Sequence, residues 1–557
     1  MYLEYMRIQN YQIFEDIELH FHEDVNYIVG ENSVGKSSFL GLLGQLTEGR
    51  GFSERDYNNP DKPIIIEAHI NLFEEEGDTC ACLPEAVKEK GRYAIRFEQR
   101  VDEVVPRIYN IRTGEELPLN IIRISRYISY SAIQPEEYYI SSRIYSRLEE
   151  RLRKWNEAGD DRIDKLAKEL ITYYQDHGQF EPSYYANMGH LFQLMTPSSQ
   201  STVDNIQVIA NVILKILLQI YKMYYSKAVP FEQLLITAKS GKRYLPLMIS
   251  IDEPEVHSHP YMQRSILDYY KRILNNEDED FCRLLKNLFH IDGVQGQLFI
   301  VTHSTDALVD DYRHIIRLYR NMAHKVKAAC GSTFHFPEEL EKHLIMHFPE
   351  IKEAFYARSV IIVEGESEYG CFRYLGKTLG IHFDYLGICL INARGESSIS
   401  KIKKLLESFN IPTVALYDAD VKEARKGGEI FYTDYICFEM DVVETLLRKK
   451  RRKVLDTVFN MAVGGAAKTN TEMMQKAVRK LEIHHKKYPP RRLQGISDRR
   501  EDDLLIYYFA WMYGNKGVIL GRALGKQLKA DEIPSSFTKV IARAGTLARY
   551  GCCDNVQ

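Results

Sequence analysis

The chain has 557 residues, more than one hydrophobic core accommodates, and this length indicates about two to four structural units. With 45% hydrophobic and 27% charged residues it has the composition of a globular protein, which excludes a disordered or fibrous chain. The formal net charge of −4 leaves nucleic-acid binding to local basic patches, and the lack of a leader-like N-terminus or a run of ~18 apolar residues predicts a cytoplasmic protein without membrane contact.

The first motif follows an apolar run, Val25–Val29, that is typical of a buried strand. Positions 30 to 37 read Gly-Glu-Asn-Ser-Val-Gly-Lys-Ser, and a helix-like segment comes next. In a P-loop of this kind, backbone N–H groups and the lysine bind nucleotide phosphates, while the serine hydroxyl binds magnesium. We therefore expect an ATP and Mg²⁺ site formed by Gly30, Asn32, Gly35, Lys36, Ser37 and Ser38.

Two further apolar runs end in polar residues. Leu245–Ile251 precedes Asp252 and Glu253, and Leu298–Thr302 precedes His303. Open α/β sheets bind ligands at the carboxyl ends of their strands, so we expect these side chains at the nucleotide. Asp252 would hold the magnesium water shell, Glu253 would act catalytically on the attacking water, and His303 would approach the γ-phosphate.

Together the three segments resemble the head of an ATP-binding-cassette ATPase of the SMC/RecF-like group. The resemblance implies Walker A, Walker B and switch-histidine roles for these positions. The signature loop of the group would precede the Asn205–Tyr225 helix, where Thr196–Ser201 offers serines but no Ser-Gly-Gly sequence. The sequence therefore does not predict efficient ATP hydrolysis.

We expect this ATPase domain to span residues 1–345, with helical insertions around 137–228. The insertions carry apolar residues at three-to-four spacing, such as Ile216, Ile220 and Tyr224, which indicate core or dimer faces. Two incomplete nucleotide sites must face each other to close. The resemblance therefore implies a homo-oligomer, a dimer or a tetramer, formed through the ATPase domain.

A second domain is predicted from 355 to 557, because acidic residues again follow strand-like runs. There are three such runs, Ser359–Val363, Thr413–Tyr417 and Tyr435–Phe438. Like charges in close quarters repel, so the three clusters call for a divalent cation as counter-charge. The acidic residues are Glu364 and Glu368, then Asp418 and Asp420, then Glu439, Asp441 and Glu444.

The strand-end Glu364-Gly365 and the Asp418-Ala419-Asp420 pattern resemble a Toprim domain. A cassette ATPase followed by a Toprim domain is the arrangement of the OLD family, which includes the nuclease subunit of Gabija antiphage systems and effectors found beside retrons. The segment Asn515-Lys516-Gly517 is similar to the basic motif of the family, which implies that Lys516 stabilises charge at a cleaved phosphate. Lys526 is the alternative.

This resemblance predicts an ATP-binding DNA endonuclease of antiphage defence, with Glu364, Asp418 and Asp420 as core ligands. Glu368, Glu439, Asp441 and Glu444 would support a second metal site. Oxygen ligands favour Mg²⁺ or Mn²⁺ over zinc.

DNA as substrate would need cationic guidance. A basic helical insertion around 446–510 carries Arg448–Lys453, His484–Lys487 and Arg491–Arg492, which we expect to attract the DNA backbone. The resemblance also implies a defence-system partner, either a helicase subunit or a reverse transcriptase with its RNA-linked DNA.

Two other functions remain open. The chain could be a non-nucleolytic SMC/RecF-like ATPase of recombination or repair, with Toprim as a DNA-binding module. A strand-passage or primer-synthesis enzyme is disfavoured, because no cleavage domain with a catalytic tyrosine is identified and the nine cysteines form no Cys-x-x-Cys zinc module.

Overall fold

The structure is a computed structural model that contains two compact units, Met1–Phe334 and His335–Gln557. The described residues are 2–48, 51–71, 79–80, 88–89, 92–117, 126–131, 216, 220, 223–224, 230–255, 260–278, 281–282, 285–286, 289–421, 428–483 and 487–550. Most of the predicted insertion around 137–228 and the whole segment Thr196–Ser201 lie outside them.

The first unit contains an antiparallel sheet in the order β2-β1-β4-β7-β8-β9, with β6 paired to β7. Buried and partly exposed residues alternate along β4 and β7, as expected for strands with one face on the core. The strands are β1 (Tyr2–Tyr11), β2 (Phe14–His20), β4 (Ile64–Asn71), β6 (Lys88–Glu89), β7 (Arg92–Gln99), β8 (Arg107–Asn110) and β9 (Glu116–Leu117).

The second sheet of this unit carries the predicted nucleotide strands. Its order is β15-β14-β3-β13-β12-β11-β5, with β10 paired to β12, and its centre is parallel. The strands are β3 (Val25–Gly30), β5 (Thr79–Cys80), β10 (Arg126–Ser131), β11 (Ile236–Thr237), β12 (Arg243–Asp252), β13 (Gly293–Val301), β14 (Ile315–Arg320) and β15 (Val326–Cys330). Every residue of β3 is buried, which explains its continuous apolar run.

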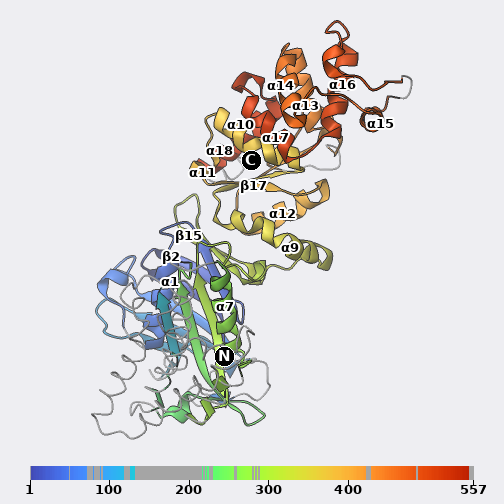
Figure 1. Cartoon of the computed structure of the whole chain (residues 1–557). Coiled ribbons are helices and arrows are strands. Elements are labelled where there is room, and N and C mark those ends of the chain that lie inside the picture. The colour runs from blue at the N-terminus through green and yellow to red at the C-terminus, as the bar shows by residue number, and fades with distance from the viewer. Residues whose placement is uncertain are drawn as a thin grey trace, which may run out of the picture. The chain divides into compact units, whose positions relative to one another are not determined.

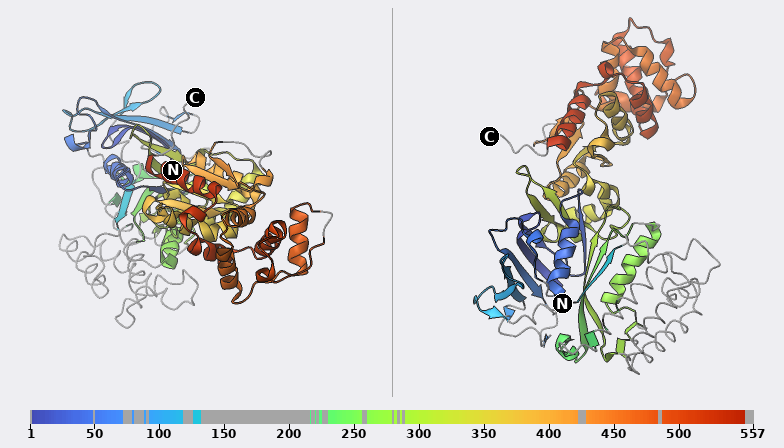
Figure 2. Two further views of the ribbon diagram at one scale, coloured as in Figure 1. Left: turned by 90° about the horizontal axis from the view of Figure 1, so that it is seen from above. Right: turned by 90° about the vertical axis from the view of Figure 1, so that its left-hand side faces the viewer.

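Two helices lie along this parallel sheet. Helix α1 (Lys36–Glu48) follows β3 after the loop 31–35, and α7 (Pro260–Leu274) lies beside the strands in both Figures 1 and 2. Proline at the first helical position suits its fixed φ and missing N–H. The described part of the unit also contains short 3-10 helices: η1 (Glu54–Asp56), η5 (Phe231–Leu234), η6 (Tyr312–His314) and η7 (Gly331–Thr333).

The described members of the predicted insertion belong to the core of the first unit. Ile216, Ile220 and Met223 are helical and buried. The Tyr224 ring contacts the rings of Phe231 and Phe289, with centroids 5.0 and 5.5 Å apart. Of the two alternatives left open for this stripe, these residues therefore support core packing.

The second unit is built on a four-stranded, all-parallel sheet in the order β17-β16-β18-β19. Helices surround it, which confirms the predicted α/β class with a parallel Toprim-type sheet. The strands are β16 (Ser359–Val363), β17 (Ile388–Asn392), β18 (Thr413–Tyr417) and β19 (Ile430–Tyr432). The helices near them are α9 (Glu338–Ile351), η8 (Lys352–Tyr356), α10 (Glu366–Thr378), α11 (Phe383–Leu386), α12 (Glu396–Ser408), η9 (Ala419–Val421), α13 (Phe438–Arg448), η11 (Ala530–Glu532) and α18 (Ser535–Tyr550).

The boundary between the units differs from the expected one. Helix α9 packs against α12, so residues after Phe334 belong to the second unit, and the first unit ends there and not near 345.

Further helices gather to one side of the second unit's sheet (Figure 1). They are α14 (Arg452–Val463), α15 (Thr471–Lys480), η10 (Leu493–Gly495), α16 (Glu501–Gly514) and α17 (Val518–Gln527). The basic insertion is therefore helical. Among the described residues, no helix is both long enough and apolar enough to cross a bilayer.

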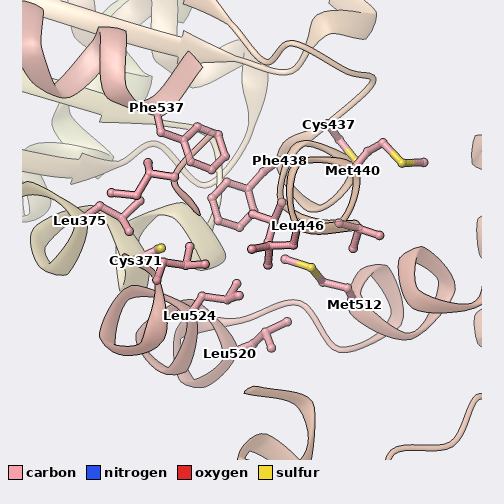
Figure 3. Close-up of a cluster of buried hydrophobic side chains, with 14 of the residues drawn as sticks. Cys371, Leu375, Cys437, Phe438, Met440, Leu446, Met512, Leu520, Leu524 and Phe537 are labelled. Atoms are coloured by element: carbon pink, nitrogen blue, oxygen red, sulfur yellow. The ribbon is translucent and has the colours of Figure 1, made fainter. Parts of the chain in front are cut away.

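An apolar core joins the helices of the second unit, and Figure 3 shows part of it. The rings of Phe438 and Phe537 stack with centroids 4.8 Å apart, which fixes the start of α13 against α18. Helices α10 and α17 cross closely because Gly521 has no side chain, and a Cβ there would lie 2.0 Å from the Ser367 carbonyl oxygen. This contact holds the segment that begins α17, including Lys516, over the first turn of α10.

Candidate nucleotide and metal sites

The P-loop connects the end of β3 to the start of α1, and two glycines make this connection possible. Gly30 has φ +147° and Gly35 has φ +97°. A Cβ on Gly30 would lie 2.3 Å from the Leu318 carbonyl oxygen, and one on Gly35 would lie 2.6 Å from the Phe14 ring. The loop therefore ends at a helix N-terminus, where free N–H groups favour phosphate.

Lys36 is folded back onto the loop that it follows. Its ammonium donates to the carbonyl oxygens of Gly30 at 3.0 Å and Glu31 at 2.8 Å, and the residue is buried. Burial lowers the pKa of Lys36, against the opposing effect of Asp252, Glu253, Glu255 and Glu31. The lysine thus lies among carboxylates, as a P-loop lysine with a neighbouring magnesium site would.

The other predicted nucleotide residues meet Lys36 at the carboxyl ends of adjacent strands. The Ser37 hydroxyl donates to Asp252 Oδ2 at 3.3 Å. Burial, followed by the charge of Glu253, raises the pKa of Asp252, while burial and then Lys36 lower the pKa of His303. Of the remaining loop residues, Asn32 is exposed and Ser38 is half-buried in α1.

Glu255 is a residue to which the sequence reasoning assigned no role. Its carboxylate accepts from the Thr302 hydroxyl at 2.8 Å and from the His303 backbone N–H at 2.6 Å. It therefore ties the turn after β12 to the turn after β13 and sets the position of His303. Glu253, the residue directly after β12, has a left-handed φ of +53°, and its N–H donates to the Val301 carbonyl at 2.8 Å.

A separate charged cluster lies at the opposite end of β3, just before Val25. His22, Asp24 and His314 bring one potential ligand atom each within 4.8 Å of one another. His22 Nδ1 and His314 Nδ1 both contact Asp24 Oδ1, the latter at 3.3 Å, and His314 Nδ1 also lies 3.1 Å from the Val25 carbonyl oxygen. Hydrogen bonds to oxygen therefore account for this group without a metal.

The second site lies at the carboxyl edge of the parallel sheet of the second unit. Glu364 follows β16, Asp418 follows β18, and Glu368 and Glu439 occupy the first turns of α10 and α13. Asp418 Oδ1 accepts from the Phe438 N–H at 3.1 Å, at the positive end of α13. The structure thus brings together the predicted strand ends at Glu364 and Asp418. The strand expected over Tyr435–Phe438 is wrong, because Phe438 is the first residue of α13 and Glu439 therefore lies on a helix.

Burial and mutual repulsion raise the pKa values of these carboxylates. Burial, then Glu439 and Asp418, raise the pKa of Glu368 to about 8. Burial, then Glu364 and Glu439, raise the pKa of Asp418 to about 7. Burial and then Asp420 raise the pKa of Glu364. Such shifts mean that the ionised forms lack sufficient counter-charge.

Two lysines supply part of that counter-charge. Lys516 lies 3.1 Å from the buried Oε2 atom of Glu439 and 4.3 Å from the centre of the Tyr513 ring. Lys480, at the end of α15, forms an ion pair with Asp420. Burial acts to lower the pKa of Lys516, but the surrounding groups, Glu439 first among them, together raise it. At Lys480 burial also acts to lower the pKa, and its neighbours, Asp420 first, together raise it.

The donor set suits a hard divalent cation, because among the described residues its carboxylates outnumber the two lysines that pair with them. The five carboxylates are Glu364, Glu368, Asp418, Asp420 and Glu439. Among the described residues, however, three ligand atoms converge within 4.8 Å only at the histidine cluster. Cation binding at the carboxylates would therefore require some of their side chains to move closer together.

Sequence reasoning missed Lys480 and Glu396, which is one of the charges that raise the pKa of Glu364. Gly395-Glu396 repeats the Gly365-Glu366 pattern after a strand, which could have signalled Glu396. No local pattern marks Lys480. Lys526, the alternative to Lys516, instead lies 5.7 Å from the Tyr374 ring centre.

Two predicted metal residues have other partners. Asp441 is fully buried and accepts from the N–H groups of Asp434 and Tyr435 at 2.9 and 2.6 Å. Burial raises its pKa to about 6, against those hydrogen bonds. Glu444 pairs with Arg448 at 3.1 Å, one turn along α13. Both are placed by helix periodicity away from the Glu439 face.

Much of the predicted DNA-attracting run Arg448–Lys453 is engaged within the unit. Arg452 donates to the Tyr508 hydroxyl at 2.8 Å and to the carbonyls of Ile496 and Leu493 at 2.7 and 2.8 Å. Arg451 pairs with Glu532 at 3.4 Å, and Lys449 donates to the Asp531 carbonyl. Residues 484–486 of the second basic run lie outside the described residues.

Comparisons with known proteins divide the chain in the same way. Residues 1–228 match the family model of the AAA ATPase domain. Residues 355–420, which include Glu364, Asp418 and Asp420, match the overcoming lysogenization defect protein-like TOPRIM domain. No curated protein matches the chain.

Solved structures are also similar to parts of the chain. The C-terminal region of the Burkholderia pseudomallei OLD protein is 18% identical, with 35% of this chain and 99% of that chain covered and a TM-score of 0.23. The SMC head domain from Thermotoga maritima is 12% identical, with 59% and 98% covered and a TM-score of 0.25. The two family models thus assign the chain an N-terminal AAA ATPase domain followed by a TOPRIM domain of the OLD-like family.

Proposed function

We propose that this protein is an ATP-binding DNA endonuclease that depends on Mg²⁺ or Mn²⁺. The observation that carries the proposal is the buried carboxylate cluster at the strand ends of the TOPRIM sheet, with Lys516 against Glu439 at 3.1 Å. Burying this many like charges is unfavourable unless a cation is bound.

Each side chain then has a defined task. Glu364, Asp418 and Asp420 would hold the metal, with Glu368 and Glu439 as supporting ligands. Such ions, when bound, activate water and stabilise the leaving oxygen of a phosphodiester. Lys516 would neutralise charge on the phosphate that is cut. Its position over α10 follows from the close crossing at Gly521.

The ATPase unit would control this activity. Lys36 would leave the carbonyls of its own loop for the β- and γ-phosphates, and Ser37 and Asp252 would hold Mg²⁺. Glu253 would position the attacking water and His303 would contact the γ-phosphate. A second copy of the chain would complete the nucleotide site, so a homo-oligomer is part of the proposal.

The biological setting that we propose is antiphage defence in the cytoplasm, with a helicase subunit or a reverse transcriptase and its RNA-linked DNA as partner. The description of the matched TOPRIM model, which refers to a lysogenization defect, supports a link to phage. Identifying the genes beside this one in its genome would test the partner directly.

The nuclease proposal is tested by Asp418→Ala in a plasmid-nicking assay with Mg²⁺ or Mn²⁺ titrated. Loss of a metal ligand should abolish nicking, whereas DNA binding in a gel shift should remain. Asp502→Ala, an exposed carboxylate of the same unit, is the matched control and should change neither property. Full nicking by Asp418→Ala, with an unchanged melting temperature, would reject the nuclease assignment.

A non-nucleolytic ATPase with a DNA-binding TOPRIM domain is the second candidate. The ion pairs of Lys480 and Lys516 favour it, because they neutralise Asp420 and Glu439 without a metal. Absence of nicking by the wild-type protein at any metal concentration, together with DNA-stimulated ATP turnover, would support this candidate over the first.

A further inference from the structure

Lys480 is the second lysine of the carboxylate site. It lies in the helical insertion around 446–510, whereas Lys516 lies just before α17. It is the last residue of α15, whose buried residues Met474 and Ala477 pack the helix against the unit. A lysine in the last turn of a helix is favourably placed by the helix dipole. The helical insertion therefore delivers a cation to the strand-end carboxylates.

The carboxylates that the two lysines face differ in depth. Lys516, 44% exposed, faces Glu439, whose side chain is 2% exposed. Lys480, 24% exposed, faces Asp420, whose side chain is 37% exposed. A divalent cation that approaches from solvent would therefore reach Asp420 before Glu439.

Asp420 cannot fully bind both Lys480 and a divalent cation. Asp420 is a proposed metal ligand, and a divalent cation competes with an ammonium for the same oxygens because of its higher charge. Within the described residues the carboxylates do not converge as the ligands of one ion would. Release of Asp420 from Lys480 would free an acceptor for the cation and, at the same time, a donor for substrate.

We propose that Lys480 is a phosphate-binding residue of this site, held by Asp420 until a divalent cation takes that carboxylate. The inference rests on the proposed nuclease function and deepens it. Metal binding would thereby switch on a second phosphate contact, supplied by the helical insertion.

The test compares Lys480→Met with a matched control on the same helix. Lys476→Met removes a lysine one turn earlier, which pairs with Glu472 at 2.7 Å away from the cluster. Mn²⁺ affinity is measured without DNA by the electron paramagnetic resonance of free Mn²⁺. Lys480→Met should bind Mn²⁺ at least threefold more tightly than the wild type, because its competitor is gone, and Lys476→Met should be unchanged.

The second readout is binding of a fluorescein-labelled oligonucleotide to the Mn²⁺-saturated protein, followed by anisotropy. Lys480→Met should weaken it at least fivefold, and Lys480→Arg should restore most of the affinity because the cation returns. Unchanged Mn²⁺ affinity, or unchanged oligonucleotide affinity, in a folded Lys480→Met protein would overturn the proposal. Neither readout requires cutting, so a wild-type protein that fails to nick plasmid would reject the nuclease function separately.

Discussion

The Ser536 hydroxyl donates a hydrogen bond of 2.6 Å to Asp441 Oδ2, and both residues are buried. This bond joins the start of α18 to the first turn of α13. The same carboxylate accepts the backbone N–H groups of Asp434 and Tyr435. Asp441 therefore closes the loop before α13, whereas its neighbour two residues earlier, Glu439, faces the charged site.

Asp441→Ala should therefore act on stability. Removing the carboxylate leaves two backbone donors and one hydroxyl buried without a partner, at a cost of about 1–3 kcal/mol for each unsatisfied group. We expect a loss of about 2–5 kcal/mol in the free energy of unfolding, measured by urea denaturation of the second unit. Glu444→Ala, which breaks an i,i+4 ion pair, should cost only about 0.3–0.5 kcal/mol. A stable Asp441→Ala protein that has lost Mn²⁺ binding would instead make this residue a ligand.

Lys36→Ala should weaken ATP binding by about tenfold or more, because a charged contact to the phosphates is lost, equivalent to at least ~1.4 kcal/mol. Titration with a fluorescent ATP analogue measures the effect. Lys62→Ala, an exposed lysine of the same unit, should leave the affinity unchanged. Equal affinities of Lys36→Ala and the wild type would remove the P-loop assignment.

Glu253→Gln should separate nucleotide binding from turnover. The amide keeps the size of the side chain but cannot polarise water, so ATP should remain bound while phosphate release falls by about 10² or more. Retained nucleotide after gel filtration and a phosphate-release assay measure the two properties. Turnover that survives this substitution would assign the catalytic carboxylate elsewhere. If the wild type also lacks turnover, the signature segment Thr196–Ser201 is the first place to test.

Gly30→Ala and Gly41→Ala should have opposite effects. At Gly30 a Cβ would meet a backbone oxygen at 2.3 Å in a left-handed conformation, so we expect a loss of at least about 1–3 kcal/mol and of ATP binding. Gly41 lies within α1 with nothing within 4 Å of an added Cβ, so alanine there should stabilise the unit by about 0.5–1 kcal/mol. Thermal unfolding of both variants measures these changes in stability. A Gly30→Ala protein as stable as the wild type would contradict this loop geometry.

The cluster of His22, Asp24 and His314 should make stability depend on pH. Burial lowers the pKa of His314, but the hydrogen bond to Asp24 and the charge of Asp310, which also pairs with Lys271, outweigh it and raise the pKa above its usual 6.5. Burial acts to raise the pKa of Asp24, but the hydrogen bonds and charges of both histidines together outweigh burial, so the pKa of Asp24 is lowered. The stabilisation that His314 contributes is therefore complete below pH 6.5, and it is lost as the pH rises through the raised pKa of the folded state. The stabilisation that Asp24 contributes is lost in acid, below about pH 4.

Asp24→Asn should accordingly destabilise the first unit more at pH 5.5 than at pH 9, by a difference of about 1 kcal/mol. Thermal unfolding in the presence of a chelator measures this difference, since the chelator excludes metal binding by the histidines. Asp61→Asn, an exposed carboxylate, is the control and should show no such dependence. A destabilisation that is the same at both pH values would mean that His314 stays neutral.

The sequence by itself determined the features that depend on short spans of chain. The apolar runs before Gly30, Asp252, Glu364 and Asp418 predict buried parallel strands, and polar residues directly after such strands share one edge of a sheet. For this reason the α/β class, the two-part organisation and the grouping of Lys36 with Asp252 could be predicted. Local periodicity is sufficient where the partners are fixed by strand register.

Only the tertiary structure decided which charges meet from distant segments. Asp441 and Glu439 are both acidic and lie two residues apart, but helix periodicity and the position of Ser536 give them different partners. From the sequence, Arg452 is expected to bind DNA. In the structure it instead donates to the Ile496 carbonyl oxygen. Lys480 reaches Asp420 across sixty positions because α15 packs where it does. Pairings of this kind depend on how helices pack, and no local pattern in the sequence specifies that packing.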